Sequence, residues 1–256
     1  MRLLVKFGGS LLEHDDARRA LAAQLAEVRD GRRQLVVVHG GGKQMTRYLA
    51  ERGVESRFVN GLRVTTPEVV DAILKVFAGS VNRELVASMI AGGLPAVGLS
   101  GIDGCLVEAE QLDPELGAVG RPVRANTAVL EALVERDFLP VVACVAGDRQ
   151  GRVFNVNADQ MAVACAAAFR ADRLLFLTDV DGVRDANGAV LPEMDIAAGE
   201  RLIAAGVATG GMQAKLNAAH QALRDGVPEV VIAPGAAANV IPRLLGGERL
   251  GTRITA

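Results

Sequence analysis

Short, uniformly apolar segments alternate along this chain of 256 residues with longer segments of helical periodicity, and this alternation limits the possible folds more than any other feature. Strands are predicted at residues 3–7, 35–39, 96–99, 141–145, 174–178 and 230–233. Helices are predicted at residues 15–30, 41–52, 67–91, 127–137, 158–169 and 211–225. Strands that are apolar on both faces are typical of a sheet that helices cover on both sides. We therefore predict an α/β fold, with an open, mostly parallel, doubly wound sheet in an αβα sandwich.

Three insertions rich in turn residues interrupt the alternation. Residues 53–64 and 105–124 are predicted to form hairpins, and Ala186-Asn187-Gly188 predicts the turn of a third. Thr66 followed by Pro67 predicts the N-cap and the first residue of the helix at 67–91. Because the sequence shows no internal repeat and no composition shift that would mark a linker, we expect a single domain over residues 1–256.

Acidic and basic residues nearly balance, which limits the classes of partner. Lys and Arg number 28 and Asp and Glu 30, for a net charge of -2. The sequence therefore has no electrostatic footprint for nucleic acid or for an anionic membrane. The longest stretch without a charge, residues 85–102, is interrupted by glycines and a proline and predicts no membrane span. We expect a small-molecule substrate, no nucleic acid and no membrane.

The three cysteines, Cys105, Cys144 and Cys165, have no C-x-x-C spacing. We expect buried, reduced thiols, which suit a cytoplasmic protein. Lys6 interrupts the apolar run at the N-terminus, and no small-residue cleavage site follows, so a secretion signal is not predicted.

Two glycine-rich turns follow the first and second predicted strands. Gly8-Gly9-Ser10 comes after the first, and His39-Gly40-Gly41-Gly42 comes after the second. Ligands of open α/β sheets bind at the carboxyl ends of the strands, where amides without a neighbouring Cβ can approach an anion. A plain tight turn explains either alone, but two on one edge favour anion binding. No G-x-x-x-x-G-K-[ST] or G-x-G-x-x-G motif occurs, which argues against a Walker NTPase and a Rossmann dehydrogenase.

Four charged residues are candidates for chemistry. Lys6 stands in an apolar strand, where burial requires an anionic partner. Asp159 falls in the first turn of a helix that Asn157 can cap, and Lys215 is close to a helix start, where a cation is unfavourable unless it faces an anion. Arg63 could hold a carboxylate with two hydrogen bonds. The alternatives are solvated lysine tips, a carboxylate that only serves the helix dipole, and a surface arginine.

The segment Thr178-Asp179-Val180-Asp181-Gly182-Val183 ends another strand at the same edge, although a turn with surface acids explains it equally well. The histidines lack the spacing of metal ligands, and no Ser or Cys has a nucleophile context. The sequence predicts neither a protein metal site nor a hydrolytic triad.

Six motifs in one order carry a resemblance. They are K-F-G-G-S at 6–10, H-G-G-G at 39–42, N-G-L-R-V-T at 60–65, N-V-N-A-D-Q at 155–160, T-D-V-D-G-V at 178–183 and G-G-M-Q-A-K at 210–215. Together they resemble the amino acid kinase family over essentially the whole chain. The second, third and fourth are most like the members that phosphorylate the γ-carboxylate of N-acetyl-L-glutamate in arginine biosynthesis.

The resemblance implies ATP as co-substrate, with Mg²⁺ held mainly by phosphates and water. Lys6 and Lys215 would contact the transferring phosphoryl oxygens, and Asp159 would hold both ammonium groups. Residues 1–172 would form an acceptor-binding lobe and 173–256 a nucleotide-binding lobe. The implied acceptor-binding residues are Gly41, Gly42, Arg63, Asn155 and Asn157. The implied ATP-binding residues are Gly8, Gly9, Asp179, Val180, Asp181, Gly182, Val183, Thr209, Gly210, Gly211 and Met212.

The helix at 67–91 has more apolar residues than one sheet can bury, which predicts a two-fold homodimer through this helix. The resemblance points to the same surface. Because the first strand starts at Leu3 with no helix before it, the resemblance also implies insensitivity to arginine.

Other functions stay open at this point. They are a kinase for carrier-linked glutamate or aminoadipate or for aspartate, a uridylate kinase, and a non-catalytic nucleotide or amino-acid sensor. The balanced charge argues against docking a carrier protein, and 256 residues leave no space for the regulatory domain usual in aspartate kinases. Lys6, Asp159 and Lys215 together favour an enzyme over a sensor.

Overall fold

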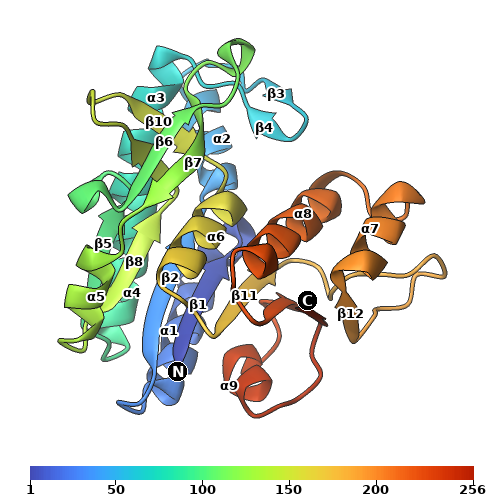
Figure 1. Ribbon diagram of the computed structural model, residues 1–256. Helices are drawn as coiled ribbons and strands as arrows, with labels where there is room; N and C mark the ends of the chain where they lie inside the picture. The colour runs from blue at the N-terminus through green and yellow to red at the C-terminus, as the bar shows by residue number, and fades with distance from the viewer.

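An eight-stranded sheet forms the centre of the molecule, in a computed structural model that describes residues 1–256 except the side chain of Ser10 (Figure 1). Its strand order is β12-β14-β13-β11-β1-β2-β8-β5, and every neighbouring pair is parallel except β13 and β14. The predicted mostly parallel α/β sheet is confirmed. Its strands are β1 (Arg2–Phe7), β2 (Gln34–His39), β5 (Ala96–Ser100), β8 (Leu139–Ala143), β11 (Arg173–Thr178), β12 (Glu193–Asp195), β13 (Val230–Pro234) and β14 (Thr252–Thr255).

Helices cover both faces of this sheet, as the apolar strands require. On one face α6 (Ala158–Ala168) and α8 (Gly210–Arg224) lie side by side, and α5 (Ala128–Val134) packs on β8 and β2 (Figure 1). On the other, α1 (Asp15–Val28) packs between α4 (Asn82–Ala91) and α9 (Val240–Leu245). The central strands are accordingly buried on both faces. Fully buried residues of β1 and β11 include Leu3, Leu4, Val5, Leu174, Leu175 and Phe176.

Smaller elements surround the sheet. The remaining helices are α2 (Gly42–Ala50), α3 (Pro67–Ile73) and α7 (Ile196–Ala204), with short 3₁₀ turns η1 (Gly9–Leu12), η3 (Asp103–Cys105) and η4 (Pro114–Leu116). In the part of the chain that the structure describes, no helix combines the length and apolarity needed to cross a bilayer.

All three predicted hairpins are present. β3 (Phe58–Val59) pairs with β4 (Leu62–Arg63), β6 (Val107–Gln111) pairs with β7 (Val119–Ala125), and Arg184 bridges to Val190. The second hairpin also joins β9 (Val145–Gly147) and β10 (Val153–Val156) in a small closed barrel. The strand predicted at 141–145 is therefore wrong at its end, because β8 stops at Ala143 and Val145 starts β9.

The helix predicted at 67–91 is present over those bounds, but it is not one regular α-helix. Thr66 caps α3 as predicted, with its hydroxyl oxygen 3.4 Å from the amide nitrogen of Val69. A π-helical segment, η2 (Leu74–Val81), then separates α3 from α4, and Gly79 within it has non-helical dihedral angles. Most apolar residues of 67–91 are buried within this chain, and the extra residue in the π turn explains how more than one helical face reaches the core.

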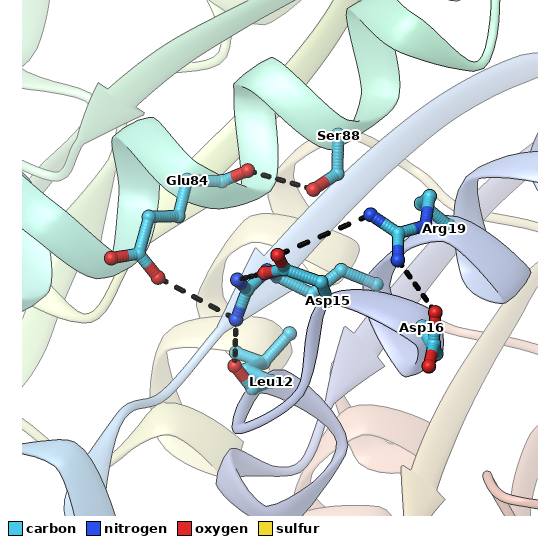
Figure 2. Close-up of polar contacts among 7 residues, drawn as sticks. Leu12, Asp15, Asp16, Arg19, Glu84 and Ser88 are labelled. Carbon is cyan, nitrogen blue, oxygen red and sulfur yellow. Dashed lines mark hydrogen bonds and ion pairs between the residues drawn. The ribbon is translucent and has the colours of Figure 1, made fainter.

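Arg18 connects α1 to its neighbours through Leu12, Asp15 and Glu84, which are labelled in Figure 2. Its guanidinium donates to the carbonyl oxygen of Leu12 at 2.5 Å, lies 3.5 Å from the carboxylate of Glu84, and pairs with Asp15. Leu12 ends η1, which follows β1, and Glu84 lies in the first turn of α4. Arg18 thus holds three elements together behind the carboxyl end of β1.

Candidate active site

The two glycine turns lie next to each other at the carboxyl ends of adjacent strands. Phe7 of β1 is paired with His39 of β2, so Gly8 and Gly40 leave the sheet side by side. A Cβ placed on Gly9 would lie 3.4 Å from the backbone nitrogen of Gly42. The predicted arrangement, two glycine turns on one edge of one sheet, is confirmed.

Lys6, Asp159 and Lys215 meet beside these turns. The Nζ atom of Lys6 lies 2.6 Å from Oδ1 of Asp159, and Nζ of Lys215 donates to Oδ2 at 3.1 Å. The three side chains come from β1, α6 and α8, and their exposed fractions are 8%, 8% and 18%. One carboxylate therefore bridges two ammonium groups contributed by distant parts of the chain.

The electrostatics of this cluster follow from its burial. Burial alone would raise the pKa of the Asp159 carboxyl, but the ammonium groups of Lys6 and Lys215 outweigh that effect and hold the pKa below its usual range. Asp159 is thus a carboxylate at neutral pH and a poor proton acceptor. As predicted, Asn157 caps α6, and its side-chain oxygen accepts from the amide of Asp159 at 2.9 Å. This cap fixes the helical turn from which the carboxylate projects.

A cavity of about 640 Å³ opens over the cluster. Among the described residues that line it, Asp179 is the only carboxylate, whereas lysines and arginines are numerous. The excess of positive charge suits a ligand that carries several negative charges. The lining residues are Lys6, Gly8, Gly9, Gly42, Lys43, Thr46, Arg47, Ala50, Phe58, Arg63, Thr178, Asp179 and Lys215.

Arg63 reaches this cavity from the β3–β4 hairpin. Its guanidinium stacks 4.6 Å from the centre of the Phe58 ring and donates to the hydroxyl oxygen of Thr46 at 2.8 Å and the carbonyl oxygen of Gly42 at 3.1 Å. The guanidinium also donates a hydrogen bond to the hydroxyl oxygen of Ser56. These contacts aim an arginine with an exposed fraction of 7% along the cavity wall.

Sequence reasoning missed five lining residues: Lys43, Thr46, Arg47 and Ala50 of α2, and Phe58 of β3. The spacing of the first three in the sequence could have indicated that they lie together. Lys43 and Arg47 are four residues apart in a helix that begins at a glycine turn, so they share one face of that helix. Phe58 had no comparable signal, because an exposed aromatic residue in a short hairpin has no periodic context.

Two predicted acceptor-site residues, Asn155 and Asn157, are not among the residues described as lining the cavity. The side-chain nitrogen Nδ2 of Asn155 donates to the hydroxyl oxygen of Thr65 at 3.1 Å, and the side-chain oxygen of Asn157 caps α6. Gly41 is beneath the surface of the glycine turn, where Phe77 packs against it.

In the two predicted nucleotide segments, Asp179 is the only predicted residue among those described as lining the cavity. Asp179, Val180 and Asp181 are exposed after β11, and Thr209, Gly210 and Gly211 are exposed at the start of α8. Gly182 has a φ of +148°, and a Cβ there would lie 2.8 Å from Oγ1 of Thr252, so this turn requires glycine.

Val183 differs from its neighbours in this segment. It is fully buried, its N–H donates to Thr252, and its carbonyl accepts from Leu191. Val183 therefore presents no surface to a ligand in this structure.

Two further observations bear on the choice of site. Within the described residues no group of three or more His, Cys, Asp or Glu side chains could hold a metal ion. A second cavity of about 650 Å³ lies between β7, α6 and α8, and its described lining contains none of the predicted residues. The positively charged cavity at the sheet edge is therefore the better candidate.

A protein-family model described as the amino acid kinase family matches residues 1–234. The chain belongs to the amino acid kinase family. Relatives within this family extend over its full length. The chain is 61% identical over 254 residues to acetylglutamate kinase of Solibacter usitatus strain Ellin6076, covering 99% of both chains. It is 44% identical over 235 residues to acetylglutamate kinase of Geobacillus kaustophilus strain HTA426, covering 91% and 90%.

The fold agrees with this family. A crystal structure of a protein from Streptococcus mutans UA159 superposes with a TM-score of 0.87 at 29% identity, covering 100% of this chain and 98% of the other. A carbamate kinase from Giardia, at 15% identity and a TM-score of 0.72, shares the fold.

Proposed function

We propose that the protein transfers the γ-phosphoryl group of ATP to the γ-carboxylate of N-acetyl-L-glutamate, forming an acyl phosphate in arginine biosynthesis. The observation that carries the proposal is the bridged pair of ammonium groups, Lys6 and Lys215, at the floor of a cavity that two glycine turns border. The choice of N-acetyl-L-glutamate as the acceptor rests on the relatives named acetylglutamate kinase, one of which is 61% identical over nearly the full length.

The reaction brings two anions together, so electrostatics controls its barrier. An oxygen of the acceptor carboxylate attacks the γ-phosphorus, and the bond to the bridging oxygen breaks, its electron pair leaving with ADP. In our proposal Lys6 and Lys215 stabilise the oxygens of the transferring phosphoryl group. Asp159 positions both lysines and takes no proton, because the acceptor carboxylate is already ionised at neutral pH.

We propose that residues 1–172 bind the acceptor and residues 173–256 bind the nucleotide. Arg63 would hold the α-carboxylate of the acceptor, with Gly41, Gly42, Asn155 and Asn157 nearby. Gly8 and Gly9 belong to residues 1–172, but their amides would approach the phosphates of the nucleotide. The remaining proposed nucleotide contacts are Asp179, Val180, Asp181, Gly182, Thr209, Gly210, Gly211 and Met212.

Mg²⁺ is expected to enter with ATP and to neutralise charge on its phosphates. The donor set at the cavity fits an ion held mainly by phosphate oxygens and water, since both oxygens of Asp159 already face ammonium groups. Asp179 is the carboxylate that remains at the rim.

We also propose a homodimer in the cytoplasm. Leu74 and Ile90 on the 67–91 segment keep exposed fractions of 39% and 56%, which supports a partner there. The thiols support a reducing compartment: Cys144 and Cys165 are buried as expected, and burial raises the pKa of each to about 12. The expectation is wrong for Cys105, which is exposed.

An assay of ADP release with a panel of acceptors tests the function. We expect turnover with N-acetyl-L-glutamate and much slower turnover with glutamate, aspartate and UMP, with trapping of the acyl phosphate by hydroxylamine as a second readout. Preference for aspartate or UMP would overturn the acceptor assignment. ATP binding without turnover of any acceptor would instead support a sensor.

A further inference from the structure

We propose that Asn82 is a positioning residue that holds the second glycine turn, residues 40–42, in the geometry that the acceptor site requires. Asn82 is the first residue of α4 and has an exposed fraction of 0%. Its side-chain nitrogen Nδ2 lies 2.9 Å from Nε2 of His39 and 2.9 Å from the carbonyl oxygen of Val141. The kinetic part of this inference rests on the proposed function, but its structural part does not.

The hydrogen bonds of His39 have a single consistent assignment. Its Nδ1 atom lies 2.7 Å from the carbonyl oxygen of Gly40, which can only accept, so Nδ1 carries the proton. Nε2 is then an acceptor and receives the amide of Asn82. Burial lowers the pKa of His39 to about 4, which keeps the ring neutral and preserves this pattern at neutral pH.

The chain of contacts ends at the acceptor half of the cavity. Asn82 orients the ring of His39, and the ring holds the carbonyl of Gly40, the first residue of the turn. Two residues later, the carbonyl of Gly42 accepts from Arg63 at 3.1 Å. A shift of the turn would therefore displace both a cavity-lining glycine and the arginine proposed to hold the acceptor.

The π-helical segment explains how Asn82 reaches this place. Phe77 in η2 packs against the same turn, since a Cβ on Gly41 would lie 2.9 Å from its ring. In a regular α-helix residues five apart are turned away from each other by about 140°. Here the N–H of Asn82 donates to the carbonyl oxygen of Phe77, an i to i+5 bond that brings both residues onto one side. The π turn thus lets Phe77 and Asn82 support the glycine turn together.

The decisive variant is Asn82→Leu, which keeps a similar volume and removes the amide. We expect the KM for N-acetyl-L-glutamate to rise about tenfold, the effect of one lost hydrogen bond, and the KM for ATP to change less than twofold. Glu84→Gln is the matched control, because Glu84 lies in the same helical turn and contacts Arg18 instead of the glycine turn. Its two KM values should stay within twofold of wild type.

His39 variants separate positioning from folding. His39→Leu should raise the acceptor KM as Asn82→Leu does, and the double variant should be no worse than either single one, since both break one path. His39→Gln should retain more affinity because its carbonyl oxygen can still accept from Asn82. A lower active fraction with both KM values unchanged would mean that Asn82 only stabilises the fold, and equal rises in both KM values would also overturn the proposal.

Hydrogen exchange tests the same inference without any substrate. In the protein without ligand, peptides covering residues 39–45 should exchange at least about threefold faster in Asn82→Leu than in wild type or Glu84→Gln. Unchanged exchange there would overturn the proposal. If wild type fails to phosphorylate N-acetyl-L-glutamate, the proposed function falls while this measurement still decides the role of Asn82.

Discussion

Lys6 and Asp159 can be buried only because each neutralises the other. A lysine in the apolar first strand requires a nearby anion, and Asp159, 153 positions later in the chain, supplies it at 2.6 Å. Removing one partner of such a buried pair costs about 3–5 kcal/mol of stability, because the other charge is left without compensation. Lys215 differs, since its side chain is more exposed and its loss leaves the Lys6–Asp159 pair intact.

Lys215→Ala should therefore impair chemistry more than folding. We expect kcat to fall on the order of 10²-fold or more, the usual cost of removing one donor to a developing charge. The thermal midpoint should stay close to that of wild type. Lys75→Ala, at an exposed lysine that is not among the residues described as lining the cavity, is the control. A kcat for Lys215→Ala within about threefold of wild type would remove this residue from the mechanism.

His39 makes stability depend on pH. Its pKa is about 4 in the folded protein, against an ordinary value of 6.5, mainly because burial disfavours the imidazolium. Above pH 6.5 the ring is neutral in both states and has no effect. As the pH falls from 6.5 toward 4, only the unfolded chain binds the proton, so the free energy of unfolding decreases.

Urea unfolding at about pH 7.5 and about pH 5 measures this effect. Wild type should lose about 2 kcal/mol more than His39→Gln over that interval, since glutamine does not titrate. Equal losses in the two proteins would show that His39 is not neutral and buried in solution.

Much of the cluster was predictable from the sequence, because burial gives charged residues a recognisable context. Lys6, Asp159 and Lys215 each stood in a place where a charge needs a partner, and the structure brings the three together. The roles of Asn82 and His39 were not predictable. A polar residue in an apolar helix carries no sequence signal for the side chain that it contacts 43 positions away.

At the scale of elements, prediction succeeded for the apolar strands at the centre of the sheet and failed for several elements near the C-terminus. The six predicted strands all exist because uniformly apolar segments of this length have few alternatives. β12, β14 and α9 were not predicted because they are short, and the nine-residue helix α7 was also missed. The π turn in the 67–91 segment was not predicted, because one inserted residue changes the helical phase without changing the composition of the segment.

The β3–β4 hairpin is the element whose function is most directly testable, because Arg63 projects from it into the cavity. Arg63→Ala should raise the KM for the acceptor at least about tenfold and leave the KM for ATP nearly unchanged, since a carboxylate clamp contacts only one substrate. Arg57→Ala, an exposed arginine of the same insertion, should behave like wild type. A loss of affinity for ATP alone, or for both substrates equally, would contradict this assignment.

At the scale of the whole molecule, β5 lies at one end of the eight-stranded sheet, and α4 packs beside it. Ile90 of α4 has an exposed fraction of 56%, and Leu74 of the preceding π segment 39%. Apolar residues exposed beside an unpaired edge strand are a site where a second copy can bind by two-fold symmetry. A stable dimer of this kind buries more than about 1,000 Å² in total.

Light scattering should therefore report a mass of two 26.7 kDa chains. Ile90→Glu should shift the protein toward monomer, because a carboxylate buried in an apolar contact without a partner costs several kcal/mol. Leu112→Glu, at a leucine with an exposed fraction of 42% outside β5 and the 67–91 segment, serves as the matched substitution and should remain dimeric. A wild-type monomer or hexamer would contradict the predicted assembly. Dissociation by Leu112→Glu but not by Ile90→Glu would place the interface elsewhere on the molecule.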